Sequence, residues 1–474
     1  MKNFIIIMLC AGLCLVANYA DIKLSTFAVK KTSTNDSLIA DNESEQSINL
    51  KSNKGSVDAI KSQDSSLFGQ FVYIFDESQG DSEIQKKINT IYNQQLNNHF
   101  GDQHYALLFK PGIYHVDVKV GYYTQVLGLG GSPDDVTIIG AVRTEDDPNT
   151  QPVDQGPGAL NNFWRSIENV SIIPTLGSLN QSGKGIAKDE NVWAVSQAAP
   201  MRNIHIKEDK TLSSSGSLRL FDMGWASGGY MANSKVDGHV EAGTQQQWFS
   251  RNSEWNQWQH GNWNIVDVGS KFVIPVESPK SNVPKNAWDT YPFTIIPLTP
   301  VIAEKPTLIM DKNDKFSVFI PELSINSSGI NWGKGSAIPL SQFYVATPHD
   351  SAEKINKELQ QEKNILFTPG VYELSEALYI NYPSTILLGI GLPSLSPMNG
   401  TQAIIVSDVS GVKIAGLMID AGPVTSPTLV QIGETTSKND HSADPTMLYD
   451  IFCRVGGLSS EVTKTESCIV LNSN

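Results

Sequence analysis

Aromatic and amide side chains gather in one short stretch of this chain of 474 residues. The aromatic members are the four tryptophans Trp248, Trp255, Trp258 and Trp263. The other members are Gln245, Gln246, Gln247, Arg251, Asn252, Asn256, Gln257 and His260. Sugar rings present apolar C–H faces and hydroxyl edges, which suit flat aromatic rings and amide groups. The stretch predicts a sugar-binding surface; in the alternative, some of the indoles fill the protein interior.

Carboxylates in the same half of the chain are candidates for acid and base chemistry. They are Glu168, Asp222, Asp237, Glu241, Glu254 and Asp267. Glycoside hydrolysis needs a carboxylic acid with a raised pKa and a second group that activates water or attacks the sugar. Spacing alone selects no catalytic pair among the six. Each of them, taken singly, is more typical of a solvated loop carboxylate than of a catalytic residue.

Other chemistries find little support in the sequence. No Gly-x-Ser-x-Gly elbow, phosphate-binding glycine loop or zinc signature is present, and we expect no metal or organic cofactor. The formal net charge of −14 argues against nucleic acid as a partner, because binding to phosphates depends on Lys and Arg. Neutral polymers remain possible partners. Cys453 and Cys468 either pair in an oxidising compartment or are two small buried side chains.

Two parts of the chain repeat the same order of elements. In each, a β-rich run is followed by an amphipathic helical segment opened by Asp-Ser, then by Phe-x-Pro-Gly-x-Tyr and a further strand. The first copy contains Phe109–Tyr114 and the second Phe367–Tyr372. The helical segments begin at Ser82 and Ser351 and are expected to cover the open end of a stack of strands. The chain therefore contains two copies of one folding unit.

Short β-rich pieces separated by Gly, Asn and Asp follow each predicted helix. This spacing is compatible with a sandwich, a propeller or a β-solenoid. The solenoid is favoured because the strands are short, several have Asn or Asp directly before an aliphatic pair, and a capping helix starts each unit. We therefore predict an all-β fold, a parallel β-solenoid in two tandem units with short N-terminal capping helices.

Composition divides the chain into five segments. Residues 1–20 resemble a secretory signal peptide, so we expect a secreted or periplasmic protein with no membrane partner after cleavage. Residues 21–66 are polar and nearly free of aromatics, which predicts a disordered leader. The first β-helix is expected over residues 67–270, a connector with a β-hairpin over 271–341, and the start of the second β-helix over 342–474.

At the level of motifs the chain resembles glycoside hydrolase family 55, tandem pectin-lyase-like right-handed parallel β-helix enzymes that cleave β-1,3-glucans with inversion. The matching pieces are Trp193–Ala199, Trp225–Tyr230, Gln246–Asn252, Ala303–Pro306, Asp444–Pro445 and Asp450–Gly457. The two Phe-x-Pro-Gly-x-Tyr units match the starts of the two β-helices of that family. The resemblance runs from about residue 70 to the last residue.

The resemblance implies roles for individual residues. In the family, a glutamine and a serine of the first β-helix hold the attacking water, and the matching catalytic residues here are Gln197 and Ser227. Substrate binding is expected from Trp225, Gln246, Gln247, Trp248, Trp255 and Trp258. In the alternative, Gln197 only forms a ladder with a neighbouring coil and Ser227 only permits a tight turn.

The family's general acid is a glutamate deep in the second β-helix, and no residue of this sequence matches it. We therefore expect either a hydrolase of β-1,3-glucan or a related glycan that lacks its acid segment, with a missing C-terminal half as a partner, or a non-catalytic carbohydrate-binding or adhesion protein. A polysaccharide lyase ranks third, because the same fold hosts lyases but the sequence has no Asp-rich cluster for calcium.

Overall fold

The computed structural model describes residues 65–146, 158–177, 189–274, 293–457 and 462–473, together with two two-residue strands near the N-terminus. The chain divides into two compact units, Met1–Ser62 and Gln63–Asn474. In the first unit only β1 (Leu9–Cys10) and β2 (Leu13–Cys14) are described, and they pair antiparallel. The rest of the predicted signal peptide, and nearly all of the predicted leader, lie outside the described residues.

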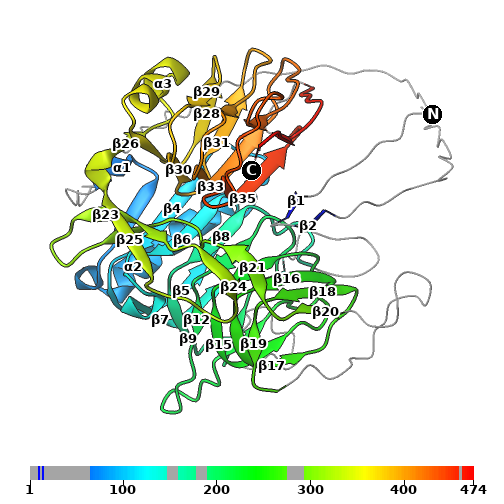
Figure 1. The fold of residues 1–474 in the computed structure, drawn as a ribbon. Helices are drawn as coiled ribbons and strands as arrows, with labels where there is room; N and C mark the ends of the chain where they lie inside the picture. Colours follow the sequence, from blue (N-terminus) through cyan, green and yellow to red (C-terminus); the bar gives the residue numbers. More distant parts are fainter. Residues whose placement is uncertain are drawn as a thin grey trace, which may run out of the picture. The chain divides into compact units, whose positions relative to one another are not determined.

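The first part of the second unit, called here the first stack, is built on two nine-stranded sheets (Figure 1). One sheet is parallel throughout and has the order β20-β18-β16-β14-β11-β8-β6-β4-β3. Its strands are β3 (Val72–Phe75), β4 (Tyr105–Phe109), β6 (Thr124–Gly128), β8 (Arg165–Glu168), β11 (Pro200–Arg202), β14 (Tyr230–Ala232), β16 (Gln247–Arg251), β18 (Asn264–Val268) and β20 (Phe293–Ile296). The parallel stacking thus continues past residue 270.

The other sheet of the first stack is also parallel and alternates with the first along the chain. Its strands are β5 (Gly112–Lys119), β7 (Val136–Arg143), β9 (Ser171–Pro174), β10 (Glu190–Val192), β12 (His205–Ile206), β13 (Ser217–Arg219), β15 (Lys235–Glu241), β17 (Glu254–Gln259) and β19 (Lys271–Phe272). All pairings in the two sheets are parallel, and most successive strands of one sheet are separated along the chain by a strand of the other, so the chain winds as a β-helix. The predicted parallel β-helix is confirmed.

A column of turns joins the two sheets in successive coils. Asn169, Asn203, Asn233 and Asn252 each follow a strand of the first sheet and have φ between +46° and +54°. Asn tolerates this left-handed conformation better than other non-glycine residues. Within the column, Asn233 Nδ2 donates to Asn203 Oδ1 at 2.7 Å. These four asparagines are therefore corners of the coils.

The predicted N-terminal helix of the first stack is α2 (Asp81–Gln95), which buries Ile84, Ile88, Ile91 and Gln95. Gln85 on this helix exchanges two hydrogen bonds with the backbone of Asp117 in β5. The shorter elements around it are α1 (Ser65–Phe68), η1 (Glu77–Gln79) and η2 (Pro133–Asp135). The helix thus covers the first coil.

A connector of antiparallel strands follows the first stack. β21 (Thr299–Ile302) pairs with β24 (Ser324–Ser327), and β22 (Thr307–Met310), β23 (Phe316–Pro321) and β25 (Gly335–Pro339) form a three-stranded sheet. The β22–β23 pair is the predicted hairpin. The 3₁₀ helix η3 (Leu340–Gln342) leads into the next unit.

The second stack again consists of two parallel sheets. The larger contains β26 (Phe343–Ala346), β27 (Asn364–Phe367), β28 (Val371–Leu374), β30 (Ile386–Gly389), β31 (Ser394–Pro397), β33 (Lys413–Asp420) and β35 (Met447–Arg454). The smaller contains β29 (Leu378–Ile380), β32 (Ile404–Val406), β34 (Val430–Ile432) and β36 (Ile469–Leu471). Helix α3 (Ala352–Gln360) starts the stack and is capped by the Ser351 hydroxyl.

The repeated Phe-x-Pro-Gly-x-Tyr motif performs the same structural task in both stacks. The Tyr114 hydroxyl donates to the carbonyls of Lys110 and Phe75, and Tyr372 does the same to Thr368 and Ala346. In both copies the tyrosine ring packs edge-on against the phenylalanine of the motif, with ring centroids 5.1 and 5.2 Å apart. The motif therefore closes the first coil of each stack.

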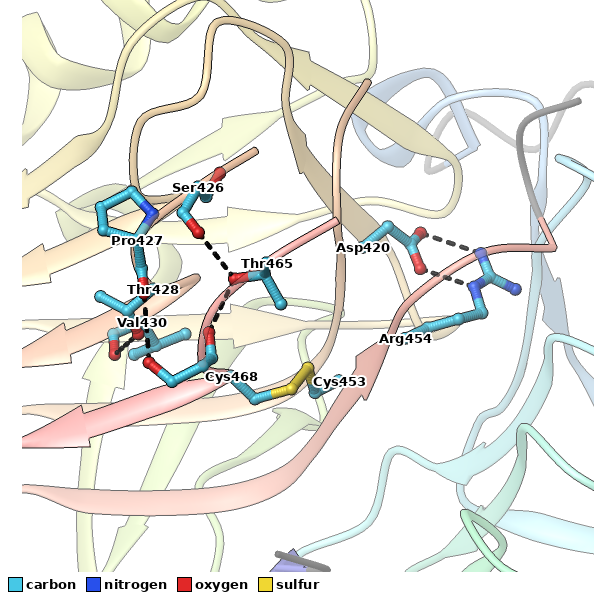
Figure 2. Close-up of a disulfide and its surroundings, with 10 residues drawn as sticks. Asp420, Ser426, Pro427, Thr428, Val430, Cys453, Arg454, Thr465 and Cys468 are labelled. Atoms are coloured by element: carbon cyan, nitrogen blue, oxygen red, sulfur yellow. Dashed lines mark hydrogen bonds and ion pairs between the residues drawn. A yellow bond between two sulfur atoms is a disulfide. The ribbon is translucent and has the colours of Figure 1, made fainter. Parts of the chain in front are cut away.

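A disulfide joins Cys453 in β35 to Cys468, just before β36 (Figure 2). Beside it, Arg454 forms two hydrogen bonds with the carboxylate of Asp420 on β33. Of the two alternatives that the sequence left open for these cysteines, the structure has the pair. Within the described ranges, no helix has the length and apolar character needed to cross a membrane.

Candidate active site

Gln197 and Ser227 lie on neighbouring turns of the first stack. Gln197 precedes β11 and Ser227 precedes β14, and these two strands pair in parallel. Gly228 (φ +103°) contacts Gln197 so closely that a Cβ there would lie 3.2 Å from Gln197 Cγ. The Ser227 N–H donates to the hydroxyl of Ser196 at 3.3 Å. The structure therefore brings the predicted pair together, with both side chains half-buried.

Buried polar side chains hold these two turns in place. The Ser196 hydroxyl donates to the carbonyl of Ala159 at 3.0 Å. Gln245 is fully buried: its Oε1 accepts from the N–H of Gly228 at 2.9 Å, and its Nε2 donates to Val195 O at 3.1 Å. Gln245 thus ties the Ser227 turn to the strand that leads into Gln197. The sequence marked Gln245 only as one of several amides.

The predicted glutamines extend this row of turns by one more coil. The Gln246 N–H donates to Ala226 O at 2.9 Å, and Gln247 O accepts from the N–H of Gly228 at 3.0 Å. Gln246 is half-buried and Gln247 is exposed. Amide, hydroxyl and amide groups therefore follow one another on three successive turns, an arrangement that can hydrogen-bond a polar ligand.

Trp225 is half-buried and lies two residues before Ser227. Its carbonyl accepts from the N–H of Ala159 at 2.8 Å, so it belongs to the same group of turns. Its placement is compatible with the predicted contact to a ligand.

The other three predicted stacking platforms are corrected by the structure. Trp248, Trp255 and Trp258 are only 2 to 4% exposed and belong to the hydrophobic core of the first stack. The Trp248 ring lies against Gly229, where a Cβ would be 2.1 Å from a ring carbon. These indoles cannot stack on a ligand. The physical reason is strand alternation: in β16, Trp248 points inward while its neighbours Gln247 and Phe249 lie more open.

A pair of buried carboxyl groups supports the Ser227 segment from the other side. Asp146 Oδ2 accepts from the N–H groups of Met223 (2.9 Å) and Gly224, and the Asp146 N–H donates to Asp222 Oδ2 at 3.2 Å. Burial, and then the nearby Asp222 carboxylate, raise the pKa of Asp146 to about 7. Asp222 was a candidate from the sequence and Asp146 was not. Their contacts position the backbone that leads to Trp225.

The remaining candidate carboxylates take part in structural contacts. Glu168 pairs with Lys305, Asp237 with His205 and Lys235, Glu241 with His260, and Glu254 with Lys271. Asp267 is buried on β18. None of these contacts places a carboxylate pair at Gln197 and Ser227. In the described part of the chain, no group of three or more His, Cys, Asp or Glu side chains is arranged to hold a metal ion.

An aromatic group that the sequence reasoning missed lies on the turns that precede Gln197. It consists of His99, Phe100, Tyr122, Phe163 and Trp164, called here the aromatic cluster. The Arg165 N–H donates to Ala198 O at 3.2 Å, so Trp164 and Gln197 occupy adjacent turns. Two adjacent pairs, His99–Phe100 and Phe163–Trp164, are visible in the sequence. The sequence does not show that they meet each other and Tyr122, because the three segments are far apart along the chain.

The chain is similar to known proteins of one family. The family model described as LAM55 pectate lyase-like domain matches residues 343–474. An exo-beta-1,3-glucanase of Streptomyces sp. (strain SirexAA-E / ActE) is 41% identical over 414 residues, which are 86% of this chain. The chain spans 62% of the length of that curated relative.

Solved structures of a related protein are also similar to this chain. The structure of sacteLam55A from Streptomyces sp. SirexAA-E is 40% identical with a TM-score of 0.74, and a variant of it in complex with glucose has a TM-score of 0.73. Each match covers 86% of this chain and 68% of the other. With its tandem β-helices, its turn motifs and these relatives, the chain belongs to glycoside hydrolase family 55.

Proposed function

We propose that this protein acts on β-1,3-glucan by inverting hydrolysis, with Gln197 and Ser227 holding the attacking water. One observation carries this function: an amide and a hydroxyl lie on adjacent turns, fixed by Ser196 and Gln245, in a chain 41% identical to an exo-beta-1,3-glucanase. An amide oxygen accepts a hydrogen bond and a hydroxyl both donates and accepts, so the two groups can orient one water molecule.

Inverting hydrolysis needs two events on opposite faces of the sugar ring. Water attacks the anomeric carbon while an acid protonates the leaving oxygen. Gln197 and Ser227 serve only the first event, because neither an amide nor an aliphatic hydroxyl is an effective proton donor near neutral pH. We assign no residue of this sequence to the acid.

The test is release of reducing sugar from laminarin, a soluble β-1,3-glucan, by the purified chain. We expect Gln197→Ala and Ser227→Ala to lower the rate by about 10²-fold or more, since general base and electrostatic groups contribute at this level. Binding of laminarin, measured by affinity electrophoresis, should change much less. Gln360→Ala, an exposed glutamine at the end of α3, is the matched control and should leave both unchanged.

A second candidate is a carbohydrate-binding protein without catalysis. It is supported by the same row of polar turns, because hydrogen-bonding groups can bind a sugar without cleaving it. Laminarin binding without sugar release would favour this candidate over the hydrolase. Absence of both would contradict both, and an unsaturated product absorbing in the ultraviolet would indicate a lyase.

We also propose that the protein is exported. The basic start and apolar run of residues 1–20 support this, as does the disulfide between Cys453 and Cys468, since disulfides persist mainly in oxidising compartments. N-terminal sequencing of the mature protein tests it: a start near residue 21 is expected, and a mature protein that retains residue 1 would contradict it.

A further inference from the structure

We propose that the last strands of the first stack form a self-association surface, through which two copies of this chain make a two-fold symmetric dimer. The surface, called here the β20 edge, consists of residues 293–302 and 323–327. These residues include β20, β21 and β24. The inference does not depend on the proposed function, because the β20 edge lies outside the turns that carry Gln197 and Ser227.

The strand β20 leaves backbone groups open for a partner. It is the last strand of its sheet, and among the described strands it pairs only with β18 (Figure 1). The Gly269 N–H donates to Ile296 O at 2.7 Å, on the side of β18. Backbone groups of successive residues point to opposite sides of a strand, so those of Phe293 and Ile295 point to the open side. An open edge of this kind is a template for another β-strand.

Large apolar side chains gather on the same surface. Val301 of β21 and Ile325 of β24 lie directly opposite each other. The exposed members of the β20 edge are Ile295 (38%), Ile296 (41%), Leu298 (46%), Val301 (45%), Leu323 (38%) and Ile325 (67%). Single exposed aliphatic residues are ordinary on a protein surface, but a group of them on adjoining strands marks a site of association.

The charge distribution favours a second copy as the occupant. The chain has a formal net charge of −14, but residues 293–302 and 323–327 include no Asp, Glu, Lys or Arg. Two acidic copies can therefore approach each other here with little repulsion. Gly329, two residues beyond the β20 edge, packs against Glu254 and Lys271, which form an ion pair of 3.9 Å. A rim with both signs of charge is complementary to itself across a two-fold axis.

Antiparallel pairing of β20 with its copy satisfies the open edge. With the two-fold axis at Thr294, Phe293 of each copy lies opposite Ile295 of the other, and the two residues exchange both of their N–H···O bonds. The pairing joins the nine-stranded sheets of the two copies into one. Pro292 and Pro297 flank the strand and have no N–H. The pairing is therefore confined to β20 and closes as a dimer.

Sedimentation velocity of the full chain over about 1–100 μM tests the proposal. We expect a species of twice the chain mass that grows with concentration, and slower amide exchange of residues 293–296 in that species. Ile295→Pro removes one edge N–H from each copy, and Ile296→Lys brings two like charges into the interface. Each should raise the dissociation constant by about 10-fold or more. Circular dichroism checks that both variants stay folded, and Ile296→Lys keeps every backbone N–H.

Two further lysine substitutions serve as controls. Ile113→Lys is matched in exposure, because Ile113 is 54% exposed but lies on β5 in the first coil of the stack. Leu471→Lys changes the last strand of the second stack, where Leu471 is 61% exposed. Both should retain the dimer. A monomer at every concentration overturns the inference, and so does a dimer that Ile295→Pro and Ile296→Lys leave intact. A dimer lost only in Leu471→Lys would place self-association at the second stack and overturn it as well.

Discussion

At the scale of single residues, Asp267 is a buried carboxyl group beside the hydrophobic core. Asp267 lies two residues after the core residue Ile265 on strand β18, and therefore on the same face, and it is only 5% exposed. Among the described residues, neither carboxyl oxygen has a hydrogen-bond partner of good geometry. Burial raises the pKa of Asp267 to about 6, although the nearby Ser270 hydroxyl and Val268 N–H oppose the shift.

Asp267→Asn should therefore change how stability depends on pH. A carboxyl group whose pKa is raised on folding stabilises the fold below its unfolded pKa, about 3.9, and that contribution is lost as pH rises through the folded value. The unmodified protein should lose on the order of 2 kcal/mol between pH 4 and 8 at this site, and the variant should not. Urea unfolding at pH 4, 5, 6, 7 and 8 measures the difference.

The exposed Asp102→Asn is the control for this series, and it should follow the unmodified protein at every pH. Parallel curves for Asp267→Asn and the unmodified protein would show that the Asp267 carboxyl group is solvated in the folded protein.

The residue scale also shows what the sequence can and cannot predict. Short family motifs single out Gln197 and Ser227, which lie on adjacent turns, although their role stays a prediction. The exposure predicted for Trp248, Trp255 and Trp258 is wrong, because abundant amides do not indicate an exposed strand. In a half-buried strand, amides on one face and indoles on the other give the same composition, as in β16. The aromatic cluster could not be predicted, since its segments meet only in the fold.

At the scale of elements, the asparagine corners determine how the coils turn. Asn233 has φ +49° and donates through Nδ2 to Asn203 Oδ1. Asn233→Ala should destabilise the protein by about 2 kcal/mol, since it loses the partly buried side-chain hydrogen bonds to Asn203 and Asn331 and places a Cβ residue without a polar side chain in the left-handed region. Asn233→Gly should cost less, because only the hydrogen bonds are lost. Chemical denaturation measures both.

Asn93→Ala, an exposed substitution on α2, is the matched control and should change stability by no more than a few tenths of a kcal/mol. If Asn233→Gly were as damaging as Asn233→Ala, side-chain bonding would explain the whole effect and backbone conformation none of it.

The disulfide holds the end of the second stack together. It closes a 15-residue separation between β35 and the segment before β36, and a loop of this size corresponds to about 3 kcal/mol of stabilisation. In the Cys453→Ser/Cys468→Ser variant, β36 should open before the rest of the stack. Trypsin should then cut at Lys464 at least 10-fold faster, as followed by mass spectrometry. Added reductant should accelerate cleavage of the unmodified protein but not of the variant.

Elements were predictable where the signal is local. The repeated Phe-x-Pro-Gly-x-Tyr motif, the helices α2 and α3 and the β22–β23 hairpin each follow from adjacent residues. The end of the first stack does not: β20 follows Pro292 and lies within the predicted connector, residues 271–341, yet it pairs in parallel with β18. Proline at the edge of a strand does not prevent pairing further along it.

At the scale of the whole second unit, buried charges join the two stacks and the connector. Arg202 of β11 donates from two guanidinium nitrogens to Asp450 of β35, at 2.8 and 2.7 Å. Lys305 of the connector lies between Asp450 (3.6 Å) and Glu168 of β8. Each of these side chains is less than a tenth exposed. Burial alone would raise the pKa of Asp450, but Arg202 and Lys305 outweigh it and hold that pKa low.

Because Asp450 is shared by three parts of the fold, Asp450→Asn should destabilise all of them together. The variant leaves two buried cations with one carboxylate fewer, and breaking such a pair typically costs about 3–5 kcal/mol. All nine tryptophans precede residue 343, so indole fluorescence reports on the first stack and the connector, although Asp450 belongs to the second stack. A fall in the fluorescence-detected urea midpoint would therefore demonstrate that the two stacks unfold together.

Asp444→Asn, an exposed substitution on the second stack, is the control and should leave that midpoint unchanged. If Asp450→Asn also left the urea midpoint unchanged, the two stacks would unfold independently, and the buried charges would not couple their stabilities.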